Sequence, residues 1–145
     1  MSIDDQVRGG SSNSTLDCSP QSLIANFHGL LDISTLGGAG FASQRTTKGI
    51  GPWDLSDYNG LEITLDRESD GKLYTIILKS DTVPKISGEE GRGTKINWEY
   101  DFRAGSGKVR VKWDDFKSTF RGKPVENPLP LDLSNITSLS IMARR

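Results

Sequence analysis

The stretch Lys95-Ile96-Asn97-Trp98-Glu99-Tyr100-Asp101-Phe102 alternates polar or charged residues with large apolar ones. After the turn residues 103–107, the alternation resumes in Lys108-Val109-Arg110-Val111-Lys112-Trp113. Side chains on a strand point to opposite faces with period two, so each half of this stretch has one apolar face and one solvated face. The pattern predicts a β-hairpin whose acidic strand pairs with its basic strand. Its apolar face needs a second sheet to cover it.

The same alternation predicts short strands along the rest of the chain. We expect strands at 15–18 and 23–28 around a Ser-Pro-Gln turn, single strands at 41–46 and 136–142, and a second hairpin formed by 61–65 and 73–78. Between them, Trp53 to Gly60 is expected to form one helical turn that Asp54 caps and Gly60 ends in a left-handed conformation. Eight or nine short antiparallel strands are typical of an all-β sandwich.

Two further expectations concern burial and mobility. We expect Trp98, Tyr100 and Val111 to be buried between two sheets, and a Trp98→Ala substitution to lower the free energy of unfolding by roughly 3 to 5 kcal/mol. The segment 81–94 is long, polar and rich in glycine. We expect it to be the most mobile internal loop.

Length and charge limit the domain organisation and the partners. The chain has 145 residues, a formal net charge of −1 and no run of Lys and Arg. This length is typical of one domain, and we expect residues 1–145 to form a single domain. A near-neutral chain lacks the basic surface that binds nucleic acids, so we expect no nucleic-acid partner. No apolar run approaches the ~20 residues of a membrane-spanning helix.

The cysteine content and the N-terminus bear on location. Cys18 is the only cysteine of the sequence, which fits a reducing compartment. The first residues are acidic and have neither the apolar segment of a secretion signal nor the arginines of a mitochondrial presequence. We therefore expect a cytoplasmic location for the sequence as it stands, and a mitochondrial one if a leader was removed.

Several patterns resemble chemical sites and do not meet their requirements. Gly105-Ser106-Gly107-Lys108-Val109 resembles a phosphate-binding loop, but it lacks the earlier glycine and the hydroxyl residue after the lysine. His28 is the only histidine, and neither zinc-ligand spacing nor a nucleophile signature joins it to Cys18. We expect no metal, no cofactor and no enzyme activity. Trp98 and Tyr100 could form a stacking platform for a sugar, but aromatic residues that alternate at strand spacing more often belong to the core.

Three sequence blocks resemble, in content and order, the complex I intermediate-associated protein 30 family. They are 4–12 (DDQVRGGSS), 37–46 (GGAGFASQRT) and 53–61 (WDLSDYNGL), followed by weaker matches at 70–74, 78–79, 116–122 and 131–136. The resemblance covers nearly the whole chain. It implies a galactose-binding-like jelly roll and a role as a mitochondrial assembly factor for respiratory complex I. It also implies one more strand after 138–142, whose absence would leave a strand edge open.

Two functions follow as hypotheses. The leading one is a non-catalytic protein-binding or assembly-factor module, whose partners the resemblance implies to be complex I subunits or assembly intermediates. The alternative is a small-ligand or carbohydrate-binding, lectin-like domain, with a site in the loops at one end of the sandwich. The polar or aromatic candidates for that site are Arg45, Trp53, Asp57 and Arg121. Arg45 has two interpretations. It is either an arginine at a sheet edge that pairs with a carboxylate or with carbonyls, or an anchor for an anionic ligand group.

Overall fold

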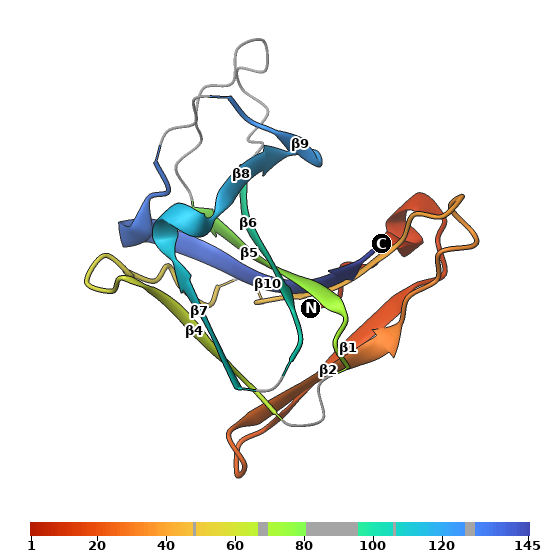
Figure 1. Ribbon diagram of the computed structural model, residues 1–145, viewed down its shortest axis with the longest axis horizontal. Coiled ribbons are helices and arrows are strands. Elements are labelled where there is room, and N and C mark those ends of the chain that lie inside the picture. The colour runs from red at the N-terminus through yellow and green to blue at the C-terminus, as the bar shows by residue number, and fades with distance from the viewer. Residues whose placement is uncertain (48, 67–69, 81–95, 106, 127–129) are drawn as a thin grey trace.

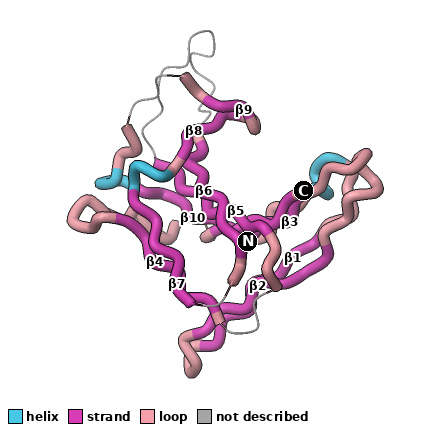
Figure 2. Tube along the Cα trace, viewed as in Figure 1, coloured by secondary structure: helices cyan, strands magenta, loops and turns pink. Residues whose placement is uncertain are grey.

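Short β-strands dominate the computed structural model, which describes residues 1–47, 49–66, 70–80, 96–105, 107–126 and 130–145 (Figure 1). The segment 81–94, predicted to be mobile, lies outside these residues. Helical structure in the described residues is limited to three single 3-10 turns, η1 (Asp5–Arg8), η2 (Trp113–Asp115) and η3 (Leu133–Asn135) (Figure 2). The prediction of an all-β protein is therefore confirmed.

The largest unit is a six-stranded antiparallel sheet. Its strands, in spatial order, are β3 (Phe41–Arg45), β10 (Ile136–Arg144), β5 (Leu73–Ser80), β6 (Asn97–Arg103), β8 (Lys117–Phe120) and β9 (Lys123–Pro124). Two antiparallel pairs complete the strands, β1 (Asn13–Ser19) with β2 (Ile24–Leu30) and β4 (Gly60–Leu65) with β7 (Gly107–Lys112). The described residues thus contain ten strands, where the sequence pattern predicted eight or nine.

The core lies on one face of the six-stranded sheet. It consists of buried apolar side chains from both layers: Ile76, Leu78, Phe102, Val111, Phe116 and Ile136. Leu78 pairs with Trp98 on one side and with Leu139 on the other, so these side chains share a face. Val111 is buried, as predicted. Trp98 and Tyr100 were also predicted to be buried, but they are only half-buried and pack against the core.

The two predicted hairpins are wrong, although their strands exist. β6 pairs with β5 and β8 while β7 pairs with β4, so the chain crosses from one sheet to the other between them. β4 and β5 are separated in the same way (Figure 1). In a hairpin the apolar faces of two strands lie side by side, and in this crossing they face each other. Both arrangements bury the same alternate residues, so alternation alone does not distinguish them.

The crossing also changes the ion pairs. The acidic residues of β6 were predicted to pair with the basic residues of β7. Glu99 and Asp101 instead bind Arg144 of β10, and Lys108 and Arg110 of β7 bind Glu62 of β4.

The segment before β4 is a turn without helix. Asp54 accepts a hydrogen bond from the backbone amide of Ser56 at 3.0 Å, so the aspartate holds a local turn here, although it caps no helix. The helical turn and the left-handed Gly60 are wrong. Gly60 is the first residue of β4, and a Cβ atom there would lie 2.0 Å from the carbonyl oxygen of Val111. Glycine is needed at this position for close approach of two backbones.

The N-terminal residues cover one edge of the large sheet. The amide of Ile3 donates to the carbonyl of Ser43 at 2.7 Å, and the amide of Arg45 donates to the carbonyl of Met1 at 2.8 Å. β10 itself lies inside the sheet, between β3 and β5. The open edge that the resemblance implied is therefore found neither at β10 nor along β3.

Candidate binding surfaces

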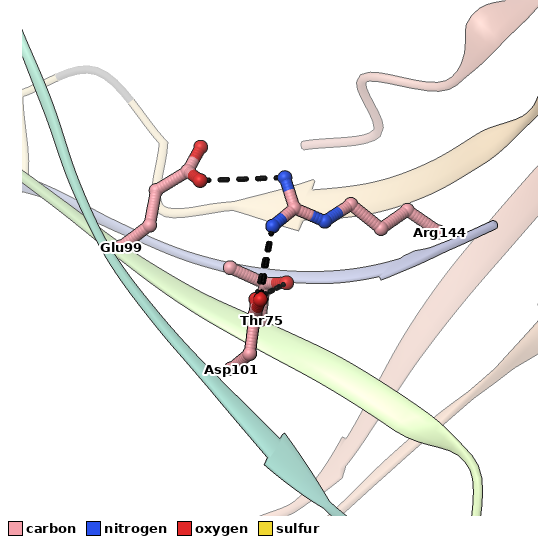
Figure 3. A network of polar contacts seen from close by, with 4 residues as sticks. All are labelled: Thr75, Glu99, Asp101 and Arg144. Atoms are coloured by element: carbon pink, nitrogen blue, oxygen red, sulfur yellow. Dashed lines mark hydrogen bonds and ion pairs between the residues drawn. The ribbon is translucent and has the colours of Figure 1, made fainter. Parts of the chain in front are cut away.

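A polar network crosses the face of the six-stranded sheet that points away from the core (Figure 3). Arg144 donates from Nη1 to Oε2 of Glu99 at 3.3 Å, and from Nη2 to Oδ1 and Oδ2 of Asp101 at 3.0 and 3.2 Å. The hydroxyl of Thr75 donates to Oδ1 of Asp101 at 2.5 Å. The network therefore ties together β10, β6 and β5, three neighbouring strands of the sheet.

The chemistry of this network is that of a closed set of ion pairs. The Glu99 side chain is only 10% exposed and that of Arg144 is 35% exposed. Because the guanidinium already binds two carboxylates, it is a poor site for an anionic ligand. The arrangement stiffens the sheet and presents a polar surface.

Asp4 and Asp5 hold the N-terminal block against β1 and β3. Asp4 accepts hydrogen bonds from the Ser43 amide at 2.9 Å, the Ser14 hydroxyl at 2.6 Å and the Ser14 amide at 3.1 Å. Burial acts to raise the pKa of Asp4, but hydrogen bonds from Ser14, Ser2 and Ser43 outweigh it and lower the pKa below its usual 3.8. Both carboxylates are buried. Their oxygens are used inside the fold.

The four residues predicted to bind a ligand do not form one cluster. Arg45 ends β3 and Arg121 follows β8, with β10, β5 and β6 between these two strands. The guanidinium of Arg121 lies 5.1 Å from the centre of the Phe120 ring. Trp53 forms a bridge with Ile136 and packs against the core, and the exposed Asp57 follows it in the same turn. Their role in ligand binding stays a prediction.

The aromatic residues are mostly used for packing. All three tryptophans, Trp53, Trp98 and Trp113, pack against the core, and so does Tyr100. Trp98 and Tyr100 therefore fit the interpretation as core residues and not the one as a stacking platform for a sugar. Tyr58 is the exposed exception among the tyrosines and tryptophans, at 63%.

A small cavity lies between β2 and the large sheet. It has a volume of about 50 Å³, and its lining includes Phe27, Tyr74 and Ala143. Ligand pockets typically measure ~300–1,000 Å³. This cavity is thus too small for a sugar or a nucleotide.

The β1–β2 hairpin carries an apolar face that extends beyond its contacts with the sheet. The register places Leu16 opposite Phe27, and Cys18 opposite Ala25, on one face. In the middle of the hairpin, the Phe27 ring packs edge-on against Tyr74, with ring centres 6.0 Å apart. Leu16, directly opposite Phe27, is 39% exposed, and nearer the turn Cys18 and Ala25 are exposed. The face that anchors the hairpin therefore continues into solvent.

The turn of this hairpin exposes a strained leucine. Leu23 has a φ of 55° and is 92% exposed. Left-handed backbone is uncommon for a bulky residue. Four of the nine exposed large apolar side chains of the described residues lie on this hairpin or its turn: Leu16, Leu23, Ile24 and Leu30. The register places Leu16 on one face of the hairpin, Ile24 and Leu30 on the other, and Leu23 at the turn. The sequence pattern missed this surface because an exposed strand and a core strand show the same alternation.

The outward face of the β4–β7 pair is basic. Lys108 and Arg110 of β7 both donate to the carboxylate of Glu62, at 2.7 and 3.0 Å. These two hydrogen bonds are the main cause of a lowered pKa at Glu62. The side chains of Lys108 and Arg110 are 54% and 78% exposed, so the pairs lie in solvent and contribute little to stability.

The described residues contain neither a side-chain cluster typical of a metal site nor a helix typical of a membrane span. No group of three His, Cys, Asp or Glu side chains within them is placed to hold a metal ion. No helix in the same residues is long and apolar enough to cross a bilayer.

Comparison with known proteins identifies relatives of the chain. The model of the complex I intermediate-associated protein 30 family matches residues 1–145. An uncharacterized protein of Schizosaccharomyces pombe is 40% identical over 149 aligned positions, covering 98% of this chain and 67% of that protein. A family 11 carbohydrate-binding module from Clostridium thermocellum, solved with a mixed-linked tetrasaccharide, has a similar jelly-roll sandwich. Its TM-score is 0.57 at 14% identity, covering 99% of this chain and 78% of the module.

Proposed function

Because this chain belongs to the complex I intermediate-associated protein 30 family, we propose that it is a non-catalytic module that binds proteins during assembly of respiratory complex I. Its partner is a complex I subunit or an assembly intermediate. This role requires the protein to act in mitochondria. A cytoplasmic member of the family would need a different protein partner.

The observation that carries this proposal is the set of exposed apolar side chains on the two faces and the turn of the β1–β2 hairpin. Isolated apolar side chains on a surface are ordinary, but a group on one projecting element is typical of an interaction site. Leu23 combines near-complete exposure with a left-handed backbone, and burial against a partner would offset the cost of its exposure. A protein surface is the class of partner that covers a hairpin of this size.

The proposal is tested by capture of complex I assembly intermediates isolated from mitochondria of the source organism. The purified chain is compared with a Leu16→Ser, Leu23→Ser double variant, and the bound intermediates are quantified after native electrophoresis. Loss of two leucines from an interface is expected to weaken binding by about tenfold or more.

Val7→Ser is the matched control, because Val7 is 77% exposed and lies outside the hairpin. It is expected to bind the intermediates as the unaltered chain does. Equal capture by all three proteins would remove the hairpin from the proposal. No capture by any of them, with the chains folded, would contradict the complex I role itself.

Carbohydrate binding is the alternative, favoured by the fold of the structural neighbour. That likeness, at 14% identity, concerns the fold alone. Sugars are commonly held by stacking on exposed aromatic rings, and Tyr58 is the one tyrosine or tryptophan that is mostly exposed. A thermal-shift series with mixed-linked tetrasaccharide and other sugars tests it. A saturable rise in melting temperature that Tyr58→Ala abolishes would favour this alternative.

A further inference from the structure

One edge of β7 has no strand beside it among the described residues. Within the part of the chain that the structure describes, β7 pairs with β4 alone. The amide of Lys112 donates to the carboxylate of Asp115 at 3.0 Å rather than to β4. Alternate residues of a strand direct their amides to the same side, so the N–H and C=O groups of Arg110 and Lys108 point toward this outer edge. The edge therefore presents backbone donors and acceptors in strand geometry.

The side chains next to this edge are cationic. Lys108, Arg110 and Lys112 are exposed on the outward face, and across the ladder they meet Thr64, Glu62 and Gly60. Across the ladder, three cations thus face one carboxylate, that of Glu62, and a second carboxylate, that of Asp115, lies at the Lys112 end of the edge. Arg110 uses only its Nε for Glu62. This row is a local positive surface on a near-neutral protein.

We propose that the outer edge of β7 takes up an extended segment of a partner protein in which acidic residues alternate with apolar ones. Its backbone pairs with Lys108 and Arg110, its carboxylates lie beside the three cations, and its apolar side chains point the same way as Val109 and Val111, toward the core. Addition of a strand to an open edge is a recurrent mode of peptide recognition. The charges select the sequence that enters, while the backbone supplies affinity.

The same charges argue against a second copy of this chain as the occupant. An antiparallel pair of β7 strands centred on Arg110 would place Arg110 opposite itself and Lys108 opposite Lys112. Like charges directly opposite each other destabilise a ladder. Cations on edge strands also prevent aggregation. Protection against pairing is therefore the competing explanation, and it predicts that no strand is added at all.

The test measures binding of a fluorescent peptide of alternating valine and glutamate, about seven residues long, by fluorescence anisotropy at two salt concentrations. The peptide is expected to bind the unaltered chain more tightly at low salt. A peptide with lysine in place of glutamate is expected not to bind. The third peptide keeps the acidic sequence but is N-methylated at the amides that would face β7. Its affinity is expected to be lower by a factor of about ten or more, because it lacks the strand-pairing donors.

Amide hydrogen exchange locates the complex. The backbone amides of Lys108 and Arg110 are expected to become protected when the acidic peptide is bound. Lys112→Glu is expected to weaken binding of this peptide about fivefold, whereas Arg103→Glu, which alters an exposed cation on β6, leaves it unchanged. Both variants are first checked for an unchanged thermal transition.

Three results would overturn the proposal. Absence of binding at millimolar peptide supports edge protection. Equal binding of the N-methylated peptide indicates electrostatic attachment without a strand. Protection confined to another edge, such as β2, assigns the peptide elsewhere. The biological meaning of this site rests on the proposed role in protein binding. The peptide test uses no complex I component, so a negative peptide result is distinguishable from failure of the proposed role.

Discussion

Asp5 and Ser12 form a buried pair in which one serine donates twice to one carboxylate. The Ser12 amide lies 2.9 Å from Asp5 Oδ1, and the Ser12 hydroxyl lies 2.6 Å from Oδ2. Both residues have an exposed fraction of 0%. The amide of Phe41 adds a third hydrogen bond to Oδ2 at 3.2 Å. The N-terminal block is thereby fixed to β3 and to the start of β1.

Removal of this carboxylate should be costly. Asp5→Ala is expected to lower the free energy of unfolding by about 3 kcal/mol, because it leaves the backbone amides of Ser12 and Phe41 without the carboxylate that accepts from them. Urea denaturation measures the loss. Asp57→Ala, at an exposed aspartate, is expected to change stability by no more than about 0.5 kcal/mol. A loss at Asp5 as small as that of the control would show that water replaces the carboxylate.

Asp4 predicts a dependence of stability on pH. Its pKa in the folded state lies below the usual 3.8, so the folded protein prefers the ionised form more than the unfolded chain does. The resulting stabilisation is present above pH 3.8 and is lost as the pH falls through the folded pKa. In urea denaturation from neutral pH to about pH 3, the difference in stability between the unaltered chain and Asp4→Asn is expected to shrink as carboxylates protonate. A difference that stays constant over this range would contradict the lowered pKa.

Gly60 should tolerate no side chain. A Cβ atom would lie 2.0 Å from the carbonyl oxygen of Val111, so Gly60→Ala must push β4 away from β7. We expect a loss of about 2 kcal/mol or more in the free energy of unfolding. Gly105→Ala is the control, since a Cβ there meets no atom within 4 Å. Comparable losses in the two variants would indicate that the strand pair adjusts.

Substitution of Trp98 measures how much the packing of this side chain contributes to stability. The side chain is half-buried and contacts the core from its side, so Trp98→Ala is expected at the lower end of the range for aromatic truncations, about 3 kcal/mol. Tyr58→Ala, at a mostly exposed tyrosine, should change stability by no more than about 0.5 kcal/mol. Thermal or urea denaturation of both variants makes the comparison. Equal effects would mean that Trp98 is not part of the core.

The fold class was predictable because alternation identifies strands and their buried faces. Phe102 and Val111 are both buried, as their positions in the pattern indicate. Pairing was not predictable in the same way. The short connection between β6 and β7 suits a hairpin and a crossing between sheets equally. The choice depends on β4, the partner of β7, which lies far away in the sequence, and on β5 and β8, the partners of β6.

The binding surfaces were less predictable for a related reason. Leu16 occupies the same kind of alternating position as Leu78, yet one is exposed and the other is fully buried. Exposure depends on whether another element covers the strand, which is a property of the whole fold. The carboxylates of Asp4 and Asp5 likewise have ordinary sequence neighbours, and it is the approach of β3 and of the start of β1 that makes them buried acceptors.

The last prediction separates the observed crossing from the hairpin that the charges suggested. A double-mutant cycle compares Glu99→Gln, Arg144→Gln and their combination, and a second cycle replaces Arg144→Gln by Arg110→Gln. Because Glu99 is nearly buried and binds Arg144 at 3.3 Å, the first cycle is expected to give a coupling energy of about 1 kcal/mol or more. Arg110 binds Glu62 instead, so the second should give less than about 0.5 kcal/mol. The reverse order of the two couplings would place β7 beside β6 and reject the pairing of β4 with β7.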